Sequence, residues 1–241
     1  MRVAPLLCAL LLAASTAWAD ADVPVIRLGE APPAPPAADP AKVKAVERFL
    51  ADRQDASANR ILASALRRDL ALKRQVDDEL LVGPRGATLL AFDFEDADVP
   101  LRGERVSRFS LPVHLLFARS DGQVVETRTE RLTFVASGAG WKCADIVPTN
   151  VVTWDDSESL DAAKAAGIGA EIDQLKARLR SASRRDQRTA YSLTDVDSAP
   201  DGRVIVRCLR YTAEPGRRGF DIDDRPVVLV KQDGSYRIDT N

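Results

Sequence analysis

The chain contains a single histidine, His114, which is the first residue to consider for catalytic chemistry. Its neighbours Val113 and Leu115 belong to an alternating apolar pattern, so His114 is predicted to lie on a strand and face away from the core. The sequence has no G-x-S-x-G turn to present a serine nucleophile and no glycine-rich loop to bind phosphate. The residue types therefore predict no catalytic site and no cofactor-binding site.

Acidic residues gather in three short runs, which raises the question of a metal site. Calcium needs six to eight oxygen ligands, usually with a glycine turn between them, and none of the runs has that spacing. We interpret the runs as solvated strand ends and a helix start, and predict no metal site. The runs comprise Asp93, Glu95, Asp96 and Asp98; Asp155, Asp156 and Glu158; and Asp221, Asp223 and Asp224.

The first 19 residues determine where the protein is expected to act. Arg2 precedes an apolar run that ends in small residues at Ala17-Trp18-Ala19, the pattern of a secretory signal peptide cleaved near Ala19. The protein is therefore predicted to be periplasmic or secreted, and no later segment is apolar for long enough to span a membrane. Residues 20–39 contain a proline-rich run and are predicted to form a flexible, extended tether.

Charge and composition limit the classes of partner. The chain has 34 basic and 36 acidic residues, a net charge of −2, and neither sign is concentrated in one segment. Proteins that bind nucleic acid carry a basic patch or stripe, so this balance predicts no nucleic-acid partner.

Cys143 and Cys208 are the two cysteines left after removal of the signal peptide. In an oxidising compartment they favour a disulfide, which would close a loop of about 65 residues and contribute on the order of 4 kcal/mol. Two buried free thiols are the alternative, because unpaired cysteine behaves as a small hydrophobic residue.

The last hundred residues repeat the hydropathy pattern of the stretch before them. With an offset of 95 positions, residues 132–135 align with 227–230, and residues 141–143 align with 236–238. Each copy has helical spacing first and then four runs of strand character separated by turns such as Asp121-Gly122 and Asp233-Gly234. The sequence predicts an α+β protein of two tandem units, 40–147 and 148–241, each with one or more helices followed by a four-stranded antiparallel meander.

The predicted boundaries include two local signals. Asp39 before Pro40 reads as a helix cap, and Asp155 with Glu158 resembles a capping box. The first unit's strands are predicted at 88–95, 106–119, 123–136 and 140–146, and the second unit's at 190–196, 203–212, 220–230 and 235–240. Residues 148–154 are predicted to connect the units. Trp154 in this connector either packs the units together or stands exposed as a contact residue.

A helix followed by four antiparallel strands resembles the cystatin-like arrangement and the NTF2-like cone. Two such units in tandem also resemble the architecture of a secreted β-lactamase-inhibiting protein. These are likenesses of shape, and shape alone does not assign a function.

The sequence favours an exported, non-catalytic binding or interaction protein of the cell envelope, with a protein or another envelope component as its partner. One alternative is an NTF2-like protein that binds a small molecule or acts as a cofactor-free enzyme. For that reading, the polar candidates on the third strand include Thr127, Thr129 and Arg131. The other alternative is a secreted inhibitor.

Overall fold

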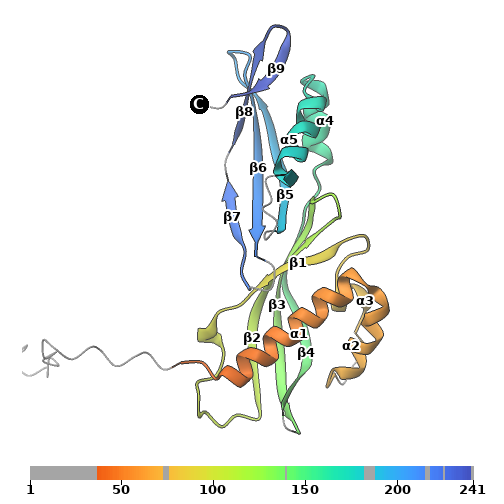
Figure 1. Cartoon of the computed structure of the whole chain (residues 1–241), viewed down its shortest axis with the longest axis vertical. Coiled ribbons are helices and arrows are strands. Elements are labelled where there is room, and N and C mark those ends of the chain that lie inside the picture. The colour runs from red at the N-terminus through yellow and green to blue at the C-terminus, as the bar shows by residue number, and fades with distance from the viewer. Residues whose placement is uncertain are drawn as a thin grey trace, which may run out of the picture. The chain divides into compact units, whose positions relative to one another are not determined.

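A computed structural model of the chain describes residues 37–72, 76–138, 140–181, 188–214, 218–224 and 226–239. The predicted signal peptide and all but the last three residues of the predicted tether lie outside this range. The described chain is α+β, as the sequence predicted, with helices and two antiparallel sheets of four and five strands (Figure 1). None of the helices in these residues is long and apolar enough to cross a bilayer.

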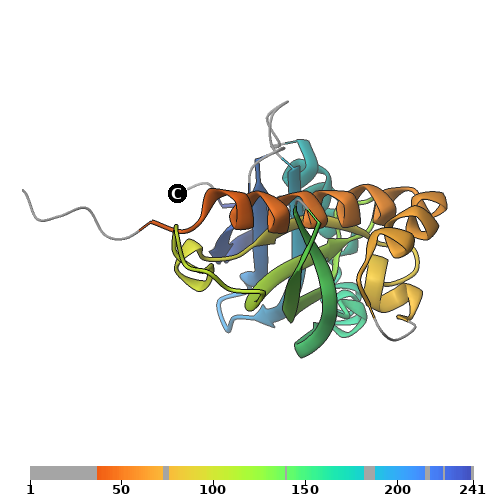
Figure 2. The ribbon, with the colours of Figure 1, turned by 90° about the horizontal axis from the view of Figure 1, so that it is seen from below.

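The first sheet is a meander in the order β1-β2-β3-β4, and α1 lies across one of its faces (Figure 2). Two short helices and a 3₁₀ turn follow α1 before the chain enters the sheet. The elements are α1 (Pro40–Ala58), η1 (Arg60–Leu62), α2 (Ala63–Asp69), α3 (Asp78–Val82), β1 (Thr88–Asp93), η2 (Asp96–Asp98), β2 (Arg108–Ala118), β3 (Val124–Ser137) and β4 (Gly140–Thr153).

Helix α1 begins where the sequence predicted. The Asp39 carboxylate accepts a hydrogen bond from the amide of Ala41 at 3.0 Å, and Pro40 occupies the first helical position. Asp39 also pairs with the buried Lys42, whose ammonium donates to the carbonyl of Glu104 at 3.2 Å. The start of α1 is therefore tied to the loop before β2.

The second sheet has the order β5-β6-β8-β9, with β7 also paired to β6. The sequence predicted one strand over 220–230, but the structure has two, and Pro226 lies directly before the second. Proline has no amide proton for the ladder, so the pairing is interrupted there. The elements are α4 (Ser157–Ala165), α5 (Gly169–Ser181), β5 (Arg188–Ser198), β6 (Val204–Ala213), β7 (Asp221–Asp224), β8 (Val227–Gln232) and β9 (Ser235–Ile238).

Two other local predictions are corrected. Residues 148–153, predicted to connect the units, continue β4, because proline at position 148 is tolerated in an edge strand. The capping box at Asp155 does not form: Asp156 is the cap of α4 and makes no side-chain cap bond, while Asp155 accepts from the amide of Ser157 at 2.9 Å.

Each sheet has its own hydrophobic core with the helices that cover it, and a third, smaller cluster contains residues from both sheets. In that third cluster Leu116 and Val124 of the first sheet pack with Ala190 and Tyr211 of the second. An amide of Tyr191 also donates to the carbonyl of Gly122 at 2.9 Å.

The predicted disulfide between Cys143 and Cys208 is absent, because both cysteines are free and buried. Cys143 belongs to the core of the first sheet and Cys208 to the core of the second. The two thiols fill separate cores, which is the small-hydrophobe role that the sequence left as the alternative.

Both thiols are therefore expected to resist alkylation in the folded protein. Burial raises the pKa of Cys143 to about 12 and that of Cys208 to about 11, and the thiolate is the reactive form. Iodoacetamide at pH 8 should leave the native mature chain unmodified, while the same reagent in denaturant without reductant should modify both cysteines. A denatured chain that takes up no reagent until it is reduced would show that a disulfide exists.

Candidate functional site

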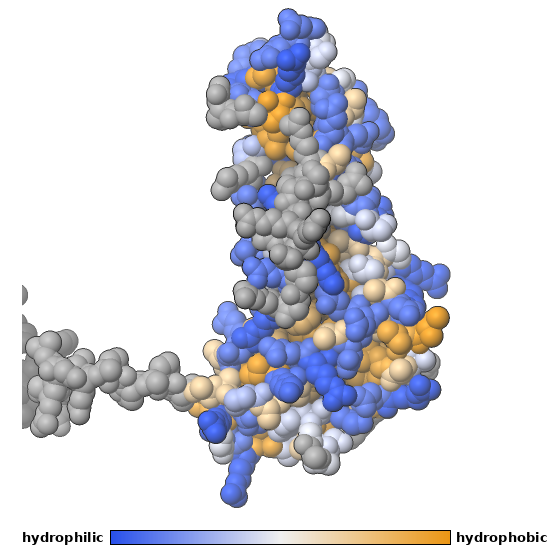
Figure 3. Space-filling model, viewed as in Figure 1, coloured by the Kyte–Doolittle hydropathy of each residue, from blue (hydrophilic) through white to orange (hydrophobic). Residues whose placement is uncertain are grey.

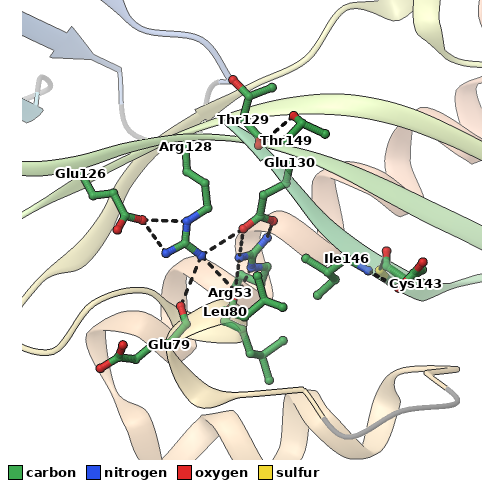
Figure 4. Close-up of polar contacts among 12 residues, drawn as sticks. Arg53, Glu79, Leu80, Glu126, Arg128, Thr129, Glu130, Cys143, Ile146 and Thr149 are labelled. Carbon is green, nitrogen blue, oxygen red and sulfur yellow. Dashed lines mark hydrogen bonds and ion pairs between the residues drawn. The ribbon is translucent and has the colours of Figure 1, made fainter. Parts of the chain in front are cut away.

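A buried ion pair joins α1 to the middle of β3 (Figure 4). The Arg53 guanidinium donates from Nη1 to Oε2 of Glu130 at 2.6 Å and from Nη2 to Oε1 at 3.2 Å. Arg53 is 1% exposed and Glu130 is completely buried. Charges this deep require full hydrogen-bonding, because an unpaired buried ion costs several kcal/mol.

A second arginine on β3 extends this pair into a network of four charges. Arg128 donates from Nη1 to Oε1 of Glu130 at 3.1 Å and from Nε to Oε1 of Glu126 at 2.7 Å. The guanidinium of Arg128 also lies 5.1 Å from the centre of the Phe117 ring. Two arginines and two glutamates balance in charge, and Arg53, Glu126, Arg128 and Glu130 are called the buried network below.

The two arginines also bind the last carbonyls of α3. Arg53 donates to the carbonyls of Leu80 at 2.9 Å and Leu81 at 2.8 Å, and Arg128 donates to those of Glu79 and Leu80 at 3.3 Å. The carbonyls of Leu80 and Leu81 accept no backbone hydrogen bond within α3, whereas that of Glu79 also accepts from the amide of Gly83. The C-terminal dipole of a helix also favours positive charge. The buried network thereby fixes α1, β3 and α3 relative to one another, and both oxygens of the Glu130 carboxylate are engaged.

An open groove lies beside this network, between α1, α2 and the first residues of β4. It has a volume of about 400 Å³, within the usual range for ligand sites. Its lining includes the aromatic rings of Phe49, Phe134 and Trp141, together with Leu66 and Leu70. The Phe49 and Phe134 rings meet edge to face with their centres 5.9 Å apart. The groove therefore offers an apolar floor.

Charged side chains of both signs surround that floor. Lys142 pairs with Asp69 at 3.1 Å, and Arg48 lies 3.9 Å from Asp52. Partial burial, with the nearby charges of Asp55 and Asp69, raises the pKa of Asp52 above its ordinary value. Lys44 also lines the groove, and it makes no ion pair within the described ranges.

The groove continues into a second hollow of about 480 Å³ between α1 and α2. Arg48, Asp52, Leu66 and Asp69 line both hollows. Leu62 lines the second one and is exposed, and its neighbour Ile61 is 82% exposed. Hydrophobic residues also reach the surface near α2 and α3 (Figure 3). Together the two hollows form one elongated surface of apolar and charged residues.

The histidine and the acidic runs do not assemble into a site. His114 is exposed, and its Nδ1 lies 3.1 Å from the hydroxyl of Thr129, its cross-strand partner. Asp96 pairs with Arg218 at 2.6 Å, which lowers the pKa of the carboxyl. Over the residues that the structure describes, no group of three or more histidine, cysteine and acidic side chains is placed to hold a metal ion.

Trp154 is half-buried and packs against the small cluster that contains residues of both sheets. Its indole donates to the hydroxyl of Thr127 at 3.3 Å. Nearby, Gln123 donates to the buried Asp156 at 2.5 Å, and Asp156 also pairs with Lys176 at 3.3 Å. Both roles considered for Trp154 from the sequence, packing and contact with a partner, stay predictions.

The buried network lies on the opposite face of β3 from the polar residues that the sequence offered as candidates. Thr127, Thr129 and Arg131 lie on the face away from α1, while Glu126, Arg128 and Glu130 are buried with Leu132 and Phe134. A signal was present: counting back in steps of two from the apolar Phe134 and Leu132 reaches those three charges. Trp141 is partly buried against the core of the first sheet and lines the groove.

Comparison of the chain with protein families, with curated proteins and with solved structures finds no significant match. Any argument about function therefore rests on the geometry of the chain itself.

Replacing Glu130 with glutamine is expected to destabilise the protein by about 3–5 kcal/mol, because it leaves two buried arginines without their shared carboxylate. Urea unfolding followed by tryptophan fluorescence measures this. The matched control is Glu95→Gln, the same change at an exposed residue, which should stay within about 0.5 kcal/mol of the wild type. A cost below about 1 kcal/mol for Glu130→Gln would contradict the role given to the network.

Proposed function

We propose that the protein is an exported, non-catalytic binding protein of the cell envelope, which holds a macromolecular partner in the groove between α1, α2 and β4. The observation that carries this proposal is the groove itself: it is open, its partly exposed apolar side chains include Leu70 and Trp141, and charges of both signs border it. Binding surfaces commonly combine aromatic anchors with a polar rim.

The chemistry around the groove supports binding more than catalysis. Cys143 lines it, but burial raises the pKa of its thiol to about 12, so the thiol stays protonated near neutral pH and is a poor nucleophile. Glu130 is a buried carboxylic acid, the type of group that could transfer a proton, but it is hydrogen-bonded to two arginines. Neither group is available for acid–base or covalent chemistry.

A partner molecule also fits the groove better than a small metabolite does. An NTF2-like carrier would enclose its ligand between the helix and the sheet. In this protein, that space is filled by the buried network and by apolar side chains of α1 and β3. The hollows beside α1 are open, and they continue into each other through shared lining residues.

We further propose that the fold consists of two tandem units of the cystatin-like or NTF2-like kind behind the signal peptide and tether, with the boundary predicted between 147 and 148 moved to the end of β4 at Thr153. The order of elements supports this, since α1 to α3 precede β1 to β4 and α4 to α5 precede β5 to β9. Repeat-equivalent positions also agree in burial, as with Phe134 and Leu229, or Val113 and Cys208. In this arrangement the groove belongs to the first unit.

The proposal is tested by photo-cross-linking in the native host, with benzoylphenylalanine in place of Lys44. One defined envelope protein should cross-link from position 44, and the same photo-reactive residue at the exposed Lys231 of β8 should not capture it. The cross-linked chain should have the mass of a product that begins at Asp20. Equal capture from both positions, or a chain that is purified with a small metabolite bound and no protein partner, would contradict the proposal.

A further inference from the structure

The groove is bordered by one edge of the first sheet, and the backbone of β4 there can be oriented from two hydrogen bonds. The amide of Ala71 donates to the carbonyl of Cys143 at 2.8 Å, so the backbone groups of Cys143 point away from β3. On β3, the amide of Ala136 donates to the carbonyl of Ser107, so Ala136 faces β2 and not its partner on β4, Trp141. Both observations indicate that the backbone groups of Trp141 and Cys143 point away from β3.

It follows that the amide and the carbonyl of Trp141, and the amide of Cys143, point outward from the sheet edge. In an antiparallel pair, residues opposite each other either exchange both hydrogen bonds or exchange neither. Trp141 and Cys143 exchange no backbone hydrogen bonds with the residues opposite them on β3. On the outer side of β4, no backbone hydrogen bond joins Trp141 to another described residue. Three backbone groups in a row thus point outward from this edge, and the next one, the carbonyl of Cys143, is already bonded to the amide of Ala71.

The middle of the β4 edge is less suited to pairing. Pro148 has no amide proton, and Thr149 is an extra residue between the register positions Pro148 and Asn150, with its hydroxyl bonded to the carbonyl of Thr129 at 3.0 Å. Prolines and bulges are the devices that commonly protect edge strands from pairing. The part of the edge at Trp141 lies before these residues and borders the groove.

We propose that the partner binds as an extended polypeptide segment that adds a strand to β4 at Trp141 and places one large apolar side chain on the groove floor. This inference rests on the proposed function and specifies how the groove is used. Strand addition draws affinity from main-chain hydrogen bonds and specificity from pockets for alternate side chains. The partly exposed Leu70 and Trp141 line such a pocket next to the edge, over the buried rings below them.

The charges of the groove indicate what else the segment carries. Arg48 and Lys142 have the acidic partners Asp52 and Asp69, whereas Lys44 has none within the described ranges. The lining of the groove therefore carries one positive charge, that of Lys44, for which it has no acidic partner. An acidic side chain in the segment, close to the apolar anchor, would complement Lys44.

The test selects twelve-residue peptides from a random phage-displayed library on the full mature chain, and synthesises the best binders with single backbone amides N-methylated. Alternate amides of an added strand face the sheet edge, so methylation at every second position should weaken binding at least tenfold. Methylation at the positions between should change it less than twofold. Selected peptides should share a large apolar residue near an acidic one, and Lys44→Glu should weaken their binding.

Two variants separate the backbone from the side chain. Trp141→Ala keeps the amide of residue 141, whereas Trp141→Pro removes it as well, so the proline variant should bind the peptides at least fivefold more weakly than the alanine variant. Circular dichroism confirms the fold of each variant, and the methylation series is independent of both.

The outcomes also distinguish this inference from the proposed function. Binding that depends on Lys44 but is insensitive to which amide is methylated would overturn strand addition and leave groove binding in place. Failure to select any peptide whose binding depends on Lys44 would overturn the inference, while cross-linking from position 44 would still decide the proposed function. Equal binding by the two Trp141 variants would also overturn it.

Discussion

The constraint on which the first half of this structure depends is the requirement that four buried charges and the end of a short helix satisfy one another. Arg53 and Arg128 each bind the carboxylate of Glu130, and both also bind carbonyls at the end of α3. A five-residue helix has too few internal hydrogen bonds to be stable alone. The arginines supply its missing partners, and the glutamates neutralise the arginines, so no member can be removed without leaving another unsatisfied.

This network also determines the groove, because its members lie four residues from the rings of the groove floor. Phe49 is one helical turn before Arg53 on α1, and Phe134 is four residues after Glu130 on the same face of β3. Fixing the Arg53–Glu130 pair therefore sets the depth at which the two rings meet and the distance between α1 and β4. Helix α1 also contacts β4, and Trp141 on this edge strand borders the groove.

The sequence was sufficient for features that depend on local physics. The α+β class follows from hydrophobic periodicity, and the start of α1 follows from Asp39 and Pro40. The sequence could not locate the groove, whose lining comes from α1, α2, β3 and β4 and exists only after packing. The disulfide prediction failed for a related reason: the two cysteines fill separate cores, and the sequence does not specify which core a cysteine fills. The alternation that places Arg128 and Glu130 inside was readable, but charged residues in a strand are ordinarily assigned to solvent.

Native-state hydrogen exchange at α3 tests the central claim most directly. The amides of Leu81 and Gly83 donate to Asp77 and Glu79 within this short helix, at 3.0 Å each. If the buried network holds α3, these amides should exchange only through global unfolding, with the same free energy and denaturant dependence as the core amides of β2 and β3. Exchange of Leu81 and Gly83 through a local opening, several kcal/mol below the global value and insensitive to denaturant, would contradict the account.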